Sequence, residues 1–381
     1  MAERDGLLNR CRAKPLPGVR IPLSPFFFSA NLADGPDGNV PAPDRPLEKE
    51  GANGPQICFL GGPLLMKTSP LASFALSAAL WLGLTCAASA QPASAAGPLA
   101  DLARANLHAI VANNHALPRL HAAEDLVLVG ESDPLAPIQG DLASLATQPI
   151  YRIVLWRIQA REAAAAGRSM EPFTRQIMAV FFTVPATSDR VNAAETLGKL
   201  RYAPSEKERA AFLQLASADT MLGLHSRWVA AGDGHTGDET ALAAFLQDRD
   251  PELRSDAAYA LRFRPHLHKA NRELLIQSAL QEPTTSSARA YLYASALFHA
   301  NPQERAKLLP EVERTVEKGT PDDAFECLNV LALVGGPEEL SRLRPFLQPV
   351  AAPYRDADAD LRVGAGYAIL SILRRHPGLR P

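Results

Sequence analysis

The segment ALAAFLQDRDPELRSDAAYAL, residues 241–261, decides the fold of this chain. Two apolar, alanine-rich runs flank the short polar turn QDRD, which predicts two helices joined by a tight connection. Asp250 and Pro251 mark the start of the second helix, because aspartate caps a helix N-terminus and proline fits the first helical turn. A helix pair of this size cannot bury its own apolar face, so we expect such pairs to stack.

Copies of this unit recur along the chain. An Arg-apolar-x-Ala-Ala-Glu-x-Leu core occupies residues 119–126 and returns 71 positions later at residues 190–197, and residues 151–158 form a helical segment halfway between them. Looser copies occupy residues 250–261 and 360–370. This self-similarity predicts a helical repeat array with an irregular period of about 30 to 41 residues and room for about eight helix pairs.

One unit of the array carries a family resemblance. Residues 246–261, with Asp-Pro before Leu-Arg and a small-residue helix, resemble a HEAT or HEAT-like (PBS-lyase type) repeat. The resemblance implies a solenoid used for protein contacts, in which Asp250 and Arg254 form part of a ladder between successive repeats and Arg362 is the equivalent in the last repeat. We therefore expect an all-α fold, a right-handed and curved α-solenoid of antiparallel helix pairs over residues 98–377.

A secretory signal peptide is predicted at residues 66–90. Lys67 gives it a positive start, and residues 71–84 form an uncharged apolar core. A membrane anchor is the alternative interpretation. The apolar run barely reaches the roughly 17–20 residues that a membrane span requires, so we favour a cleaved signal peptide.

The cleavage site follows the apolar core. Ala88 and Ala90 stand at the two positions that a signal peptidase inspects, which makes Gln91 the first mature residue. Residues 91–97 are then a linker to the repeats. These features predict a periplasmic or secreted protein without a stable membrane span after cleavage.

The sequence before the signal peptide looks unlike the rest. Residues 1–65 are rich in Pro, Gly and Asn, show no sustained helical or strand period, and are predicted to be disordered. A signal peptide must emerge first from the ribosome, so we interpret this leader as a non-native N-terminal extension. Three of the four cysteines precede the predicted cleavage site, which leaves Cys327 alone. A single cysteine forms no internal disulfide, so the fold must rest on its apolar core.

Composition and motifs argue against several function classes. From Gln91 onward the chain has 31 Lys and Arg against 34 Asp and Glu, a formal net charge of −3. It therefore lacks the excess of basic residues that is typical of nucleic-acid-binding proteins. That part of the chain contains no G-x-S-x-G, phosphate-binding glycine loop, H-E-x-x-H or C-x-x-C motif. We therefore assign no catalytic, cofactor-binding or metal-binding residue. Cys327 falls inside an apolar helix and is expected to be buried and inert.

Two short patterns resemble metal sites. Residues 356–360 read DADAD, like the first ligand positions of a calcium loop, but Leu361 replaces the glycine of the sharp turn. An acidic turn that caps the next helix explains the same residues. His266 and His268 have no Cys or carboxylate beside them in sequence and are interpreted as histidines of a solvated turn.

The recurrent carboxylates Glu124 and Glu195 are the most informative polar residues, because they occupy the same position of the repeat. The favoured interpretation is an ion pair with a neighbouring arginine such as Arg119 or Arg190. The alternative is an acidic stripe along a concave groove.

These patterns predict an exported, non-catalytic interaction scaffold that presents a concave helical surface to a protein or peptide partner. The alternative is an accessory or regulatory module for a secreted or envelope-bound enzyme. An enzyme with a site spread over several repeats ranks third. Two buried carboxylates and a histidine in one pocket would reverse that ranking.

Overall fold

The structure is a computed structural model that describes residues 96–185, 187–216, 220–232, 235–348 and 356–379. The predicted leader (1–65), the signal peptide (66–90) and the cleavage residues Ala88, Ala90 and Gln91 lie outside the described residues. The described residues are helical and contain no strand, which confirms the predicted all-α class. None of their helices is both long and apolar enough to cross a membrane.

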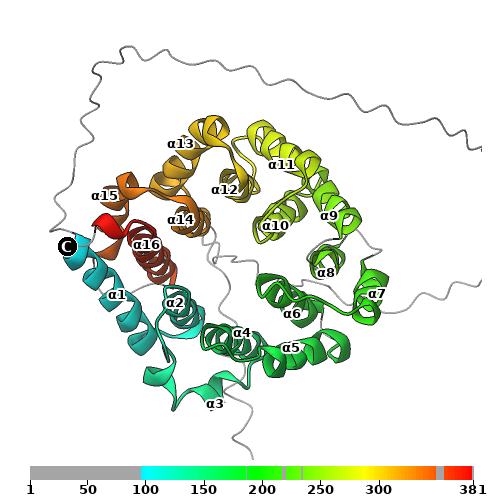
Figure 1. The fold of residues 1–381 in the computed structure, drawn as a ribbon, viewed down its shortest axis with the longest axis horizontal. Coiled ribbons are helices and arrows are strands. Elements are labelled where there is room, and N and C mark those ends of the chain that lie inside the picture. The colour runs from blue at the N-terminus through cyan, green and yellow to red at the C-terminus, as the bar shows by residue number, and fades with distance from the viewer. Residues whose placement is uncertain (1–95, 186, 217–219, 233–234, 349–355, 380–381) are drawn as a thin grey trace, which may run out of the picture. The chain divides into compact units, whose positions relative to one another are not determined.

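Every second helix lies on the inner side of the array (Figure 1). These inner helices are α2 (Ala116–Leu128), α4 (Pro149–Ala165), α6 (Thr187–Lys199), α8 (Met221–Ala231), α10 (Pro251–Arg262), α12 (Arg289–His299), α14 (Pro321–Val334) and α16 (Asp356–Arg375). Their alanines are almost all buried, so neighbouring inner helices can approach closely.

The remaining helices lie on the outer side (Figure 1). They are α1 (Ala96–Asn113), the short α3 (Leu142–Leu145), α5 (Glu171–Thr183), α7 (Glu206–Leu215), α9 (Thr236–Ala243), α11 (Lys269–Gln281), α13 (Pro302–Lys318) and the short α15 (Leu340–Leu343). Five 3-10 segments, Ala136–Ile138, Ala244–Gln247, Pro337–Glu339, Arg344–Leu347 and Pro377–Leu379, complete the described connections and the end of the chain.

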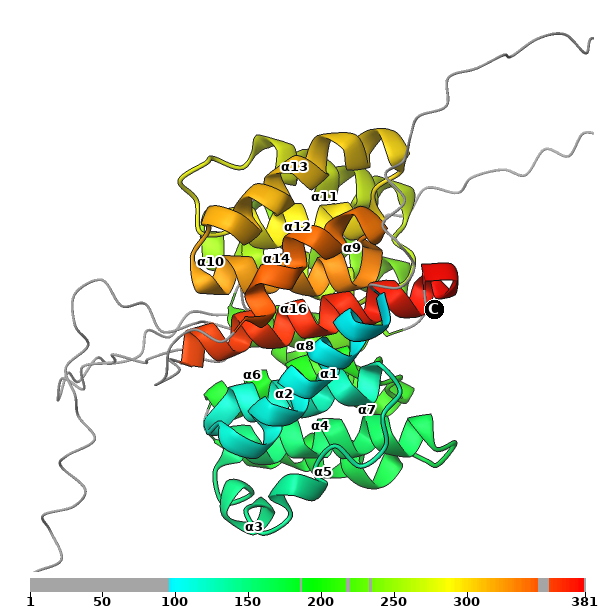
Figure 2. The same ribbon diagram turned by 90° about the vertical axis from the view of Figure 1, so that its left-hand side faces the viewer.

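The two ends of the array meet. Each inner helix packs on the next one along the chain, and the last, α16, packs on both α1 and α2. Figure 2 shows α16 lying along α1. The inner helices therefore form a closed ring, a feature that the expected curved solenoid did not include.

Local sequence signals set the helix starts. Asp250 caps α10 by accepting a hydrogen bond from the Glu252 amide at 2.9 Å, and Pro251 is the first helical residue. Asn301 caps α13 in the same way, in a reciprocal capping box with Glu304. Such caps depend only on adjacent residues, which is why the start at Asp250 and Pro251 could be predicted from the sequence.

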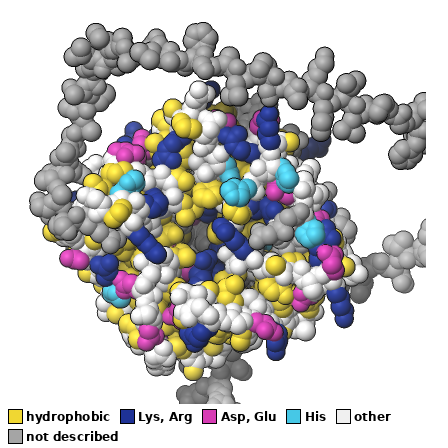
Figure 3. Space-filling model, viewed as in Figure 1, with side chains coloured by type: hydrophobic (Ala, Val, Ile, Leu, Met, Phe, Trp, Pro, Cys, Tyr) yellow, Lys and Arg dark blue, Asp and Glu magenta, His cyan; other side chains and the backbone are white. Residues whose placement is uncertain are grey.

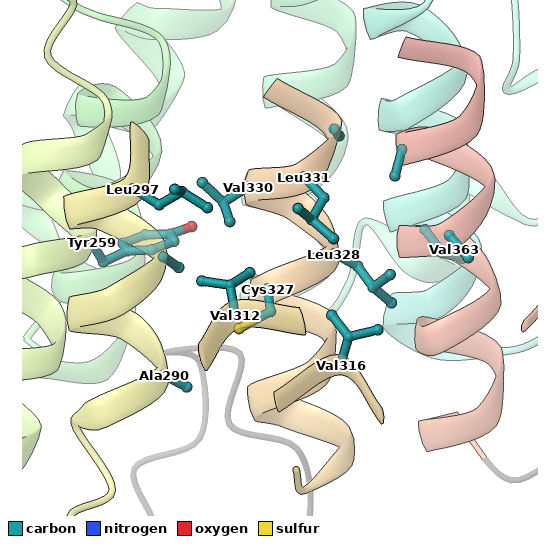
Figure 4. Close-up of a cluster of buried hydrophobic side chains, with 14 of the residues drawn as sticks. Tyr259, Ala290, Leu297, Val312, Val316, Cys327, Leu328, Val330, Leu331 and Val363 are labelled. Atoms are coloured by element: carbon teal, nitrogen blue, oxygen red, sulfur yellow. The ribbon is translucent and has the colours of Figure 1, made fainter. Parts of the chain in front are cut away.

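The core between the inner helices is tightly packed. A Cβ atom added to Gly198 on α6 would lie 2.4 Å from the Trp228 ring on α8, so glycine is required for this approach. Cys327 is fully buried beside Val312 and Val316, as predicted (Figure 4). Burial raises the pKa of its thiol, which keeps the thiol protonated and unreactive.

Candidate functional site

A pocket of about 130 Å³ lies inside the ring, and seven of the eight inner helices contribute side chains to it; only α8 does not. Figure 3 shows a hollow near the centre of this face, with basic and hydrophobic side chains around it. The lining contains the cations Arg157, Arg161, Lys199 and Arg262, the carboxyls Glu124, Asp125 and Glu326, the rings of His121, Tyr259, Phe263, Tyr291, Phe325 and Tyr367, and also Leu128, Asn329 and Leu333.

Glu124 on α2 is held by two arginines of α4. Arg157 donates to both of its carboxylate oxygens, at 2.8 Å from Nε and 2.6 Å from Nη2. Arg161, one turn later, has Nε 2.8 Å from Glu124 Oε1. Burial alone would raise the pKa of Glu124, but the attraction of Arg157 and Arg161 and the hydrogen bonds from Arg157 hold it far below its usual range. Glu124 is therefore ionised.

Asp125, the next residue, has the opposite electrostatic environment. Burial raises the pKa of its carboxyl well above the usual range, and repulsion from Glu124 and Asp360 adds to the shift. Arg161 opposes the shift without cancelling it. The pocket thus holds the ionised Glu124 beside Asp125, whose carboxyl stays protonated to a higher pH than an ordinary aspartate does.

A second ion pair joins Lys199, which lines the pocket, to Glu195, which does not. Lys199 Nζ lies 2.8 Å from Oε1 of the fully buried Glu195, and the Tyr259 hydroxyl donates to the same oxygen over 3.3 Å. Burial lowers the pKa of Lys199, and Glu195 opposes this effect. Glu195 Oε2 has no hydrogen-bond partner within the described part of the chain.

A third ion pair bridges α10 and α14, the inner helices on either side of α12. Arg262 on α10 donates to Glu326 on α14, and both side chains are buried. Burial raises the pKa of Glu326, although Arg262 lowers it. His121 stacks on Phe325 with ring centroids 5.6 Å apart, and its Nδ1 is 3.1 Å from Asp360 Oδ1. These contacts join helices that are far apart in sequence and fix the side chains that face the pocket.

The structure brings the two recurrent carboxylates into the same region, with partners other than the expected ones. Glu124 pairs with the α4 arginines, whereas Arg119 pairs with Asp141 at 2.8 Å. Arg190 donates from Nε to the Phe181 carbonyl at 2.9 Å, so it is not the partner of Glu195. The expected partners Arg119 and Arg190 are therefore wrong. Glu124 pairs with arginines of the neighbouring inner helix α4, whereas Glu195 pairs with Lys199 one turn later in its own helix, α6.

The predicted ladder residues lie away from the pocket. Asp250 is the cap of α10, and Arg254 donates to Glu282, at the end of α11 in the next helix pair, with Nη2 2.5 Å from Oε1. Arg254 also donates to the carbonyl of Asp248 at 2.8 Å. Arg362 reaches across the closure of the ring to Asn106 on α1. None of these three residues is among those that line the pocket.

The calcium-loop pattern forms the first turn of α16, which begins at Asp356. Among the described residues, no group of three or more His, Cys, Asp and Glu side chains is arranged to hold a metal ion. His268 contacts Thr236 Oγ1 at 2.7 Å near the surface.

Sequence reasoning missed most of the pocket, including Asp125, Arg157, Arg161, Lys199 and Glu326. One signal for Arg157 was present. It lies 33 residues after Glu124, within the range of the repeat period, in the apolar segment that the repeat analysis places between the two best copies. A charged residue amid apolar helix positions needs a buried partner, and the repeat spacing points to one.

Comparison with known proteins adds no functional assignment. The sequence matches no protein-family model, and neither a curated protein nor a solved structure matches it.

Proposed function

We propose that this chain binds a small organic ligand in the pocket inside the ring. The observation that carries the proposal is the convergence of side chains from seven inner helices on one open, mixed polar and aromatic cavity. Sites for small molecules are concave, mainly apolar, and carry a few fixed polar groups with perturbed pKa values. The pocket of about 130 Å³ is slightly smaller than the cavity of about 150 Å³ that holds a benzene ring, so it suits only a compact ligand.

The same cavity alters the order of the functional hypotheses. Glu124, Asp125 and Glu326 are buried carboxyls, and His121 lines the pocket with them. This meets the criterion for ranking an enzyme above an interaction scaffold, and ligand binding in the same pocket is the first step of either function. Among the described residues, the exposed large apolar side chains are Leu102, Phe182, Leu280 and Leu333. They lie on four different helices, which gives the scaffold hypothesis little support.

Catalysis by proton transfer is the second candidate. Neighbouring carboxyls whose pKa values are shifted in opposite directions are the arrangement that acid–base enzymes use. Asp125 would donate a proton to a bound ligand, and the ionised Glu124 beside it would keep the Asp125 carboxyl protonated.

The broader setting is also proposed. HEAT-like repeats would provide the helix pairs, and export would place the ligand in the periplasm or outside the cell. The accessory-module hypothesis is compatible with this function if the ligand regulates an envelope-bound enzyme.

A blocked pocket tests ligand binding. Leu333 lines the cavity and is 39% exposed, so Leu333→Trp adds bulk at its opening. Leu102→Trp on α1, at a position that is 40% exposed and outside the pocket, is the matched control. A library of small polar aromatic compounds is screened by thermal shift and ligand-observed NMR on the full chain. We expect hits that Leu333→Trp abolishes and Leu102→Trp retains. Hits insensitive to Leu333→Trp, or no hits, would contradict the proposal.

A further inference from the structure

We propose that the ligand of the central pocket carries a carboxylate group, and that the guanidinium of Arg161 binds it. This inference rests on the proposed ligand-binding function and adds the chemical class of the ligand. It follows from how charge and hydrogen bonds are distributed among Glu124, Arg157 and Arg161.

Arg157 satisfies Glu124 by itself. Its Nε and Nη2 each donate to a different carboxylate oxygen, which is the two-pronged geometry that matches guanidinium to carboxylate. Its Nη1 donates to Thr196 Oγ1 at 3.3 Å. Both partners are buried, so this pair is a fixed part of the wall.

Arg161 is left with an unmatched charge. Its Nε lies 2.8 Å from Glu124 Oε1 but makes no hydrogen bond, because the angle is unsuitable. Arg161 makes no hydrogen bond to any residue in the described part of the chain, and it acts on Glu124 through charge attraction alone. The side chain lines the pocket and retains 19% exposure, so a ligand can reach it. Two guanidinium groups therefore share one carboxylate, and the outer one has free donors.

Asp125 does not supply the missing negative charge. It lines the same pocket beside Arg161, but its burial and the nearby Glu124 and Asp360 favour the protonated carboxyl. A carboxylate from the ligand would meet the planar fork of Arg161, and a protonated Asp125 could donate a further hydrogen bond to it. The rings of Tyr291, Phe325 and Tyr367 provide an apolar wall for the rest of the ligand.

Three phenyl probes of similar size and different charge test this assignment: benzoate, neutral benzamide of the same planar shape, and cationic benzylamine. Their affinities for the full chain are measured by NMR titration at constant ionic strength, together with inorganic phosphate. We expect benzoate to bind about tenfold or more tightly than benzamide, because a charge-assisted pair replaces a neutral one. We expect benzylamine to bind most weakly, and phosphate not to displace benzoate.

Arg161→Gln removes the proposed anion contact. It should abolish the preference for benzoate over benzamide by weakening benzoate far more than benzamide, whereas Arg161→Lys should retain part of the preference. Arg168→Gln removes one positive charge at an exposed position that follows α4 and does not line the pocket, so it is the charge-matched control. Far-UV circular dichroism checks that each variant is folded.

The outcomes separate the two proposals. Equal affinity for benzoate and benzamide, with both sensitive to Leu333→Trp, would overturn the carboxylate assignment and leave the ligand pocket standing. Displacement of benzoate by phosphate, or an unchanged preference in Arg161→Gln, would also overturn the assignment. If none of the probes binds, the carboxylate assignment fails and the compound screen alone decides the ligand pocket. Binding that is insensitive to Leu333→Trp contradicts both proposals.

Discussion

Arg362, in the last inner helix, donates a hydrogen bond from Nε to Asn106 Oδ1 in the first helix, over 3.1 Å and across 256 residues of sequence. Both side chains are buried, and Asn106 Nδ2 donates in turn to the Leu102 carbonyl at 2.9 Å. An open repeat array exposes its two terminal faces and needs capping repeats. Here the terminal faces cover each other, so the stability of the first helix pair depends on the last.

The closure can be tested at Asn106. Asn106→Ala should lower the free energy of unfolding by about 1–3 kcal/mol, because it leaves a buried guanidinium without this acceptor. Asn113→Ala, on the same helix but exposed, should change it by less than about 0.5 kcal/mol. Urea denaturation followed by circular dichroism measures both. Equal stability of the two variants would show that the buried Asn106–Arg362 contact contributes nothing to the closure.

The close approach of α6 and α8 gives a second prediction. Gly198→Ala places a Cβ atom against the Trp228 ring, and Trp228 is only 3% exposed, so the ring has little room to move. Overpacking of this kind costs about 1–3 kcal/mol. Gly237→Ala on α9 meets no atom within 4 Å and should be neutral or stabilising, since alanine favours helix. A higher melting temperature for Gly198→Ala than for Gly237→Ala would refute the packing argument.

The sequence was sufficient for features that depend on neighbouring residues. The Asp250–Pro251 helix start, the alternation of helices and the burial of Cys327 follow from caps, periodicity and an apolar context. The position of Glu124 on the inner side was signalled by its recurrence at Glu195. These are local properties, and they appear in a single segment of sequence.

Closure and pocket depend on distant contacts. Nothing in the segment around Arg362 indicates that it meets Asn106 instead of a further repeat, because the small rotation of each helix pair accumulates over the whole array. Lys199 and Glu326 come from different helices and both line the cavity only once the ring is closed. The sequence therefore predicted the building unit better than the site that the units enclose.

Glu339 predicts a pH dependence of stability. Burial, together with repulsion from Glu313, raises its pKa to about 7, despite Arg342 Nε at 3.4 Å from Glu339 Oε2. Between the ordinary pKa of 4.5 and about 7, the folded state holds more protons than the unfolded state, so stability falls as pH rises through this range. The loss should amount to about 1–3 kcal/mol.

Glu339→Gln should remove this slope. Melting temperatures of the full chain are measured between pH 5 and pH 8 for the parent protein and the variant, and the parent should lose stability more steeply. Glu273→Gln, at an exposed carboxylate on α11, should retain the parent slope. Parallel curves for the parent and Glu339→Gln would rule out Glu339 as the titrating group.

Arg157 gives the last prediction, because it neutralises a carboxylate that is almost fully enclosed. Arg157→Met should lower the free energy of unfolding at pH 7 by about 3 kcal/mol or more, since Glu124 would keep only the ill-aligned contact with Arg161. The double variant Arg157→Met/Glu124→Gln removes the stranded charge and should be more stable than Arg157→Met alone.

The pH dependence gives an independent readout of the same pair. In the parent protein the pKa of Glu124 is lowered, so the pair is intact above its ordinary pKa and is lost only as pH falls further. Without Arg157, burial favours protonation of Glu124, and the cost of the substitution should shrink as pH falls from 7 toward 5. Urea denaturation at several pH values measures this. A cost that is constant with pH, and equal in the single and double variants, would mean that Arg157 acts by packing alone.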